Sequence, residues 1–86
     1  MCYLTSKGEI LTITRSMSDE VRGDSICVNS LAPSLTMSEG VLGNEEFLAG
    51  RDTIVESRVF KRYQEPEGLT GAMLFLVSSY SDFMTG

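Results

Sequence analysis

Residues 26–32, Ile-Cys-Val-Asn-Ser-Leu-Ala, form a nearly continuous apolar run. Asp24-Ser25 precedes this run and Pro33 follows it, so residues that favour turns mark both of its ends. Such a run is typical of a parallel β-strand that is covered on both faces. We therefore predict a strand over residues 25–32. Because a helical pattern comes directly before it, we expect one repeat of an α/β fold with a parallel sheet.

The helical pattern covers residues 3–22. One face of the predicted helix collects residues at steps of three and four: Tyr3, Lys7, Ile10, Thr14, Met17 and Val21. Gly23 follows, and glycine is common just past a helix C-terminus. We expect the helix to end there.

Tyr3 and Lys7 lie four residues apart, which places their side chains on one helix face, one turn apart. In that position the Lys7 ammonium favours the ionised form of the Tyr3 phenol. Tyrosine's reference pKa is about 10, so acid–base work near neutral pH requires a shift of roughly 3 units, or about 4 kcal/mol. The sequence has no histidine, which excludes His-based triads and His metal sites, and we predict no metal site. Tyr3 and Lys7 are the candidate catalytic residues.

Beyond the predicted strand, Pro33-Ser34-Leu35-Thr36 stands where ligands bind in open α/β sheets, at the carboxyl end of the strand. Residues 35–64 then form a long excursion in which Asn44 is a candidate helix start. An excursion of this length is often a substrate-binding lid, and the alternative is a surface helix with loops. Its apolar residues fit either a substrate pocket or a core: Met37, Val41, Leu42, Phe47 and Leu48. Pro66 suits the first position of a late helix over residues 66–78.

Composition excludes several classes of function. Twelve acidic and seven scattered basic residues give a net charge of −5, a poor electrostatic match for nucleic acid. The longest apolar run, residues 72–77, is too short to span a membrane, and no secretory signal is visible. We expect a cytoplasmic protein in which Cys2 and Cys27 stay reduced, with Cys27 buried in its apolar run.

Several segments resemble motifs of the short-chain dehydrogenase/reductase superfamily, in the order and at the spacing of that family. Residues 3–8, Tyr-Leu-Thr-Ser-Lys-Gly, resemble its YxxSKG motif, and residues 28–34, Val-Asn-Ser-Leu-Ala-Pro-Ser, resemble VNxxxPG. Pro66-Glu67 with Gly71-Ala72 resembles its late helix, and residues 81–86, Ser-Asp-Phe-Met-Thr-Gly, its SDFITG turn.

This resemblance implies a Rossmann-type doubly wound parallel sheet and an oxidoreductase that transfers hydride between NAD or NADP and a carbonyl/alcohol substrate. It implies that Tyr3 is the general acid/base and that Lys7 both assists Tyr3 and binds the nicotinamide ribose. The implied cofactor-binding residues are Lys7, Pro33, Ser34, Thr36 and Ser38. Residues 35–64 would be the substrate loop, and the first helix would join a homo-oligomer interface in the full-length form.

The chain departs from the family pattern at three positions. Ser34 replaces the usual glycine, Thr36 stands where an aliphatic residue is common, and Gly68 replaces an acid after Pro66-Glu67. The glycine weakens the start of that helix by up to about 1 kcal/mol.

The sequence contains no GxxxGxG loop for a pyrophosphate, and it matches only about the last third of the family's domain. We interpret it as a C-terminal part of a reductase that begins just before the tyrosine motif. A single strand has two unpaired edges, so we expect the isolated chain to be helical, poorly packed and without dehydrogenase activity. One alternative is a non-catalytic remnant that associates with a full-length relative through its first helix. The other is a small α-helical domain that matches the motifs by chance.

Overall fold

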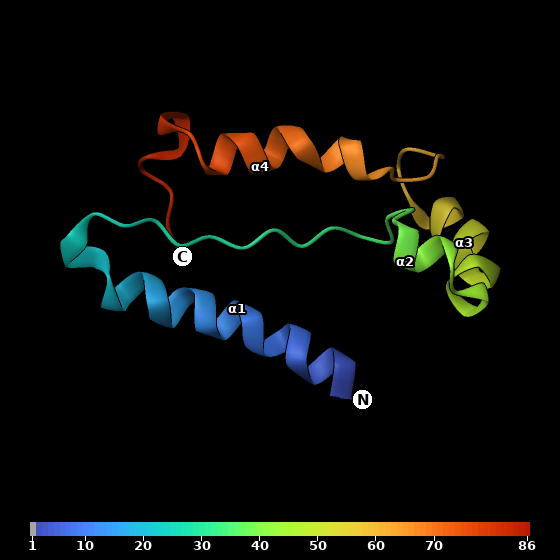
Figure 1. The fold of residues 1–86 in the computed structure, drawn as a ribbon, viewed down its shortest axis with the longest axis horizontal. Helices are drawn as coiled ribbons and strands as arrows, with labels where there is room; N and C mark the ends of the chain where they lie inside the picture. The colour runs from blue at the N-terminus through green and yellow to red at the C-terminus, as the bar shows by residue number, and fades with distance from the viewer. Residues whose placement is uncertain (1) are drawn as a thin grey trace. The chain divides into compact units, whose positions relative to one another are not determined.

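The computed structural model describes residues 2–86, which divide into two compact units (Figure 1). The first unit consists of Met1–Leu31 with Met73–Gly86, and the second of Ala32–Ala72. No helix over residues 2–86 has the length and apolar character needed to cross a bilayer.

The first unit begins with α1 (Cys2–Glu20), which contains no proline and only one glycine, Gly8. Hydroxyl groups bond back to the preceding turn of α1, as in Thr14 Oγ1 to Ile10 O at 2.7 Å. A 3₁₀ turn follows over Arg22–Asp24, and Arg22 forms an ion pair with Asp19. The predicted helix is confirmed, but the predicted stop at Gly23 is wrong. Ser25 takes the left-handed conformation, with φ 57°, and redirects the chain.

The predicted strand over 25–32 is not confirmed, because no strand forms within residues 2–86. The chain is extended after Ser25, and its neighbour is the C-terminal segment (Figure 1). Val28 O accepts from Gly86 N at 2.8 Å, and Val28 N donates to Thr85 Oγ1 at 3.0 Å. A β-ladder needs repeated backbone pairs along two chains. Here one of the two bonds goes to a side chain, so the ladder does not propagate.

Without a sheet, the extended segment is not covered. Cys27 is exposed and free, as is Cys2, so the expected burial of Cys27 is wrong. The Cys27 thiol lies 3.7 Å from Asp82 O, which accepts its weak hydrogen bond.

The second unit contains α2 (Glu39–Leu42), α3 (Glu45–Ser57) and a 3₁₀ turn over Pro66–Leu69. The predicted helix start at Asn44 is confirmed: its Oδ1 accepts from Glu46 N at 3.0 Å and Phe47 N at 3.4 Å. Pro66 opens the predicted late helix, which starts as this 3₁₀ turn and continues as α4 (Thr70–Leu76) across the boundary between the units. A parallel bridge joins Thr36 to Gln64 and closes the base of the long excursion.

Burial is sparse. Met37, at 7% exposure, is the one buried apolar residue among residues 2–86, and it belongs to the core of the second unit. Leu42 and Phe47, considered with Met37 as pocket or core residues, are exposed. The low burial follows from the missing sheet within the described residues, because the helices there have no apolar layer to cover.

Candidate active site

Tyr3 and Lys7 lie one turn apart at the start of α1, and they touch. The Lys7 Nζ atom lies 5.5 Å from the centroid of the Tyr3 ring, a cation–π distance. Both side chains are exposed, Tyr3 by 67%. At an exposed site such a contact contributes about 0.5–1 kcal/mol. The ammonium and the phenol therefore lie on the same side of α1, as their spacing of four residues predicts.

The other predicted residues belong to the second unit. Pro33 and Ser34 are exposed on extended chain, whereas Thr36 and Ser38 are half-buried. Thr36 Oγ1 donates to Ser34 O at 3.0 Å, and Ser38 N donates to Thr36 O at 2.8 Å. Ser38 stands at the N-cap of α2, but its side chain makes no capping bond. All four lie within residues 33–38, and the candidate catalytic residues Tyr3 and Lys7 belong to the other unit.

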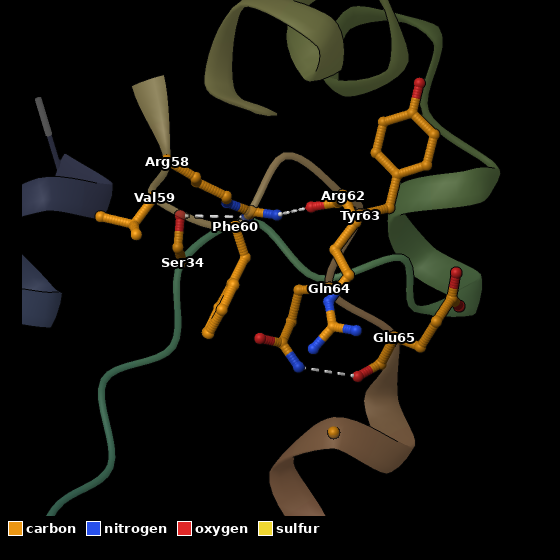
Figure 2. A pocket seen from close by; sticks show the side chains of 9 residues that line it. Ser34, Arg58, Val59, Phe60, Arg62, Tyr63, Gln64 and Glu65 are labelled. Atoms are coloured by element: carbon orange, nitrogen blue, oxygen red, sulfur yellow. Dashed lines mark hydrogen bonds between the residues drawn. The ribbon is translucent and has the colours of Figure 1, made fainter. Parts of the chain in front are cut away.

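A cavity of about 670 Å³ opens within the second unit (Figure 2). Its lining comprises Ser34, Arg58, Val59, Phe60, Arg62, Tyr63, Gln64, Glu65 and Gly68. Ser34 thus shares this cavity with the segment that follows α3. The guanidinium of Arg62 lies 5.2 Å from the centroid of the Phe60 ring.

Arg58 is the residue of this cavity that sequence reasoning missed. Its Nη2 donates to Leu35 O at 2.6 Å and to Ser34 Oγ at 3.3 Å, and its Nη1 donates to Arg62 O at 3.1 Å. Figure 2 shows the guanidinium between the Ser34 hydroxyl and the Arg62 carbonyl. No sequence signal could have found it, because 23 and 24 residues separate Arg58 from Leu35 and Ser34.

Tyr63 is tied to α3 through Asp52. The Tyr63 hydroxyl donates to Asp52 Oδ1, and the Arg51 guanidinium lies 5.4 Å from the Tyr63 ring centroid. The hydrogen bond raises the pKa of Tyr63 above its ordinary value, since the phenol must keep its proton to donate. Desolvation and the charge of Asp52 act in the same direction, and Arg51 opposes them.

Comparison with known proteins places these residues in a family. A family model described as "Enoyl-(Acyl carrier protein) reductase" matches residues 1–86. The chain belongs to the short-chain dehydrogenase/reductase superfamily. This family has a Rossmann-like α/β fold, of which residues 2–86 hold helices and no strand.

Curated relatives in the superfamily align with nearly the whole chain. The chain is 32% identical over 84 residues to meso-2,3-butanediol dehydrogenase of Serratia marcescens, covering 98% of this chain and 33% of the relative. It is 33% identical over 87 residues to 5-keto-D-gluconate 5-reductase of Escherichia coli strain K12, with the same coverage. For 3-oxoacyl-[acyl-carrier-protein] reductase of Rickettsia felis the identity is 32% over 84 residues, covering 98% of this chain and 34% of the relative. The chain therefore spans about a third of the length of these relatives. No solved structure matches it.

Proposed function

We propose that this chain carries the catalytic tyrosine and lysine of an oxidoreductase that transfers hydride between NAD or NADP and a carbonyl/alcohol substrate. The observation that supports this most directly is the Lys7 ammonium 5.5 Å from the Tyr3 ring centroid. Membership of a superfamily of dehydrogenases and reductases supports it independently.

Tyr3 is the general acid/base in this proposal. In the reductive direction the Tyr3 O–H bond breaks, and its proton goes to the carbonyl oxygen while the carbonyl carbon accepts a hydride. In the oxidative direction the phenolate takes the proton back from the alcohol. The Lys7 ammonium stabilises the phenolate between these events. NAD(P), when bound, supplies or accepts the hydride.

The donor set suits the nicotinamide end of this cofactor. Lys7 has an exposed ammonium with three N–H donors, which match ribose hydroxyl oxygens. The Ser38 side chain makes no capping bond, so its hydroxyl is not committed to the start of α2. The sequence holds no GxxxGxG loop for the pyrophosphate. We therefore propose that Lys7, Pro33, Ser34, Thr36 and Ser38 bind the nicotinamide nucleoside, and that the 86-residue chain alone does not turn over.

The test uses the complete product of the reading frame that encodes these residues. Tyr3→Phe removes the proton but keeps the ring, so kcat should fall by about 10²- to 10⁴-fold. The Kd for NAD(H) or NADP(H), measured by fluorescence titration, should stay within about twofold because the phenol is not assigned to cofactor binding. Tyr80→Phe is the matched control, since Tyr80 is an exposed tyrosine far along the chain from the pair. Unchanged turnover in Tyr3→Phe overturns the assignment.

A second candidate function is supported by the surface of α1. This helix exposes five large aliphatic side chains: Leu4, Ile10, Leu11, Ile13 and Met17. A non-catalytic protein that pairs through α1 with a full-length reductase would bury them. Sedimentation of the purified chain mixed with such a reductase separates the two functions. Two results together favour the non-catalytic function: the chain forms a complex with the reductase that Leu11→Glu abolishes, and the complete product shows no turnover of its own.

A further inference from the structure

Arg58 lies directly after α3, where the excursion over residues 35–64 turns back toward its start. α3 ends at Ser57, and the Arg58 N–H still bonds to Val55 O at 3.1 Å. The Arg58 backbone is extended, with φ −82° and ψ 157°. Its side chain is half-buried, although its neighbours Val59 and Phe60 are exposed. Arg58 therefore uses its backbone amide to end α3, while its guanidinium is free to bond to other segments at this turn.

The guanidinium joins two segments that are distant in sequence. On one side it donates to Leu35 O at 2.6 Å and Ser34 Oγ at 3.3 Å. On the other side it donates to Arg62 O at 3.1 Å. The bond to Leu35 is short and charge-assisted, the class of hydrogen bond that is about twice as strong as a neutral one. Figure 2 shows this arrangement at the wall of the cavity.

The side chain at position 34 completes the contact. Ser34 stands where a glycine would offer no hydroxyl, and its Oγ accepts from Arg58. The adjoining backbone is held as well, because Met37 N donates to Gln64 O at 2.8 Å. The segment from Ser34 to Met37 is thus fixed at both ends against residues 58–64.

We propose that Arg58 is a positioning residue that holds Ser34 and Leu35 against the end of α3, and that it thereby couples α3 to the segment over residues 33–38 that is proposed to bind the cofactor. The inference rests on the proposed function, which assigns Ser34 to the nicotinamide. Arginine suits this role because its planar guanidinium presents five N–H donors in a fixed fork. A lysine ammonium would act as a point charge and could not hold the same acceptors in one plane.

The experiment measures cofactor binding in the complete product of the reading frame. Arg58→Met should raise the Kd and the KM for the cofactor about tenfold, because the segment loses the charge-assisted hydrogen bond to Leu35 O that holds it in place, while kcat changes by less than about twofold. Arg58→Lys should restore part of the affinity. Ser34→Ala should weaken binding less than Arg58→Met does, and it should add nothing in the double variant because the two residues share one contact.

Arg62→Met is the matched control. Arg62 lines the same cavity, but its guanidinium lies over Phe60 and only its backbone oxygen takes part in the contact. Its removal should leave cofactor affinity unchanged. If Arg58→Met binds the cofactor with the same Kd as the wild type, whether or not its Tm falls, the role of Arg58 is overturned and the proposed function is not. A wild-type protein that binds neither NAD(H) nor NADP(H) overturns the proposed function and the coupling with it. If Arg58→Met does not fold, Arg58→Lys decides by its Kd.

Discussion

The backbone amide of Met37 donates a 2.8 Å hydrogen bond to the carbonyl oxygen of Gln64. The bond closes the base of the excursion that contains α2 and α3, beside the parallel bridge of Thr36 with Gln64. Met37 is also the one apolar residue that the structure buries among residues 2–86. Packing and backbone bonding therefore coincide at this residue.

Met37→Ala should open this closure. Replacing a buried methionine by alanine removes apolar contacts and costs about 2 kcal/mol or more. We expect the free energy of local opening at the residue 37 amide, measured by hydrogen exchange, to fall by about 2 kcal/mol. Met73→Ala is the control, because Met73 is half exposed and belongs to the other unit. Equal protection of this amide in the variant and the wild type would contradict the prediction.

Asn44→Ala should loosen the start of α3. The Asn44 side chain accepts from two backbone amides, and loss of such a cap costs about 1 kcal/mol. Hydrogen exchange at Glu46 and Phe47 should accelerate about fivefold. Ser38→Ala offers the comparison, since Ser38 holds the same N-cap position on α2 without a capping bond. An equal effect at the two caps argues against the role of the Asn44 side chain.

Ser25→Gly should stabilise the turn after α1. Ser25 has φ 57°, a left-handed conformation that costs a residue with a Cβ about 1–2 kcal/mol. Glycine avoids this cost but loses about 0.5–1 kcal/mol through the entropy of the unfolded chain, so the net gain should be about 0.5 kcal/mol. Urea unfolding followed by helical circular dichroism measures it. Ser16→Gly, inside α1, should lower stability instead. Stabilisation by Ser16→Gly would contradict the prediction.

Tyr63 should make the stability of the second unit fall at alkaline pH. Its pKa in the folded chain is raised by the hydrogen bond to Asp52. The stability that this bond contributes is complete below the unfolded pKa of about 10, and it is lost as the pH rises through the folded value. An NMR titration of the Tyr63 ring should show the raised pKa, and Asp52→Asn should return it toward the ordinary value. A titration that Asp52→Asn does not alter contradicts the assigned cause.

Local sequence signals predicted α1, the start of α3 and the late helix that begins at Pro66, together with the pairing of Tyr3 with Lys7. A separation of four residues places two side chains on one face wherever a helix forms, so this geometry needs no tertiary contact. The Asn44 cap and the position of Pro66 are local in the same sense, because each depends on backbone groups within three residues. The motifs that identified the superfamily are likewise short and contiguous.

Tertiary structure alone decided the rest. An apolar run predicts a strand, but a strand forms only where a second segment of the chain supplies repeated backbone partners. Residues 27–29 instead bond to a few groups of residues 82–86, and several of those bonds use side chains. Ser25 rather than Gly23 takes the left-handed turn because that is where the chain turns toward these partners. The contact of Arg58 with Ser34 and Leu35 joins residues more than twenty positions apart, and no periodic pattern encodes it. Hydrogen bonds between distant segments depend on how the chain folds back on itself, and a local sequence pattern does not specify that folding.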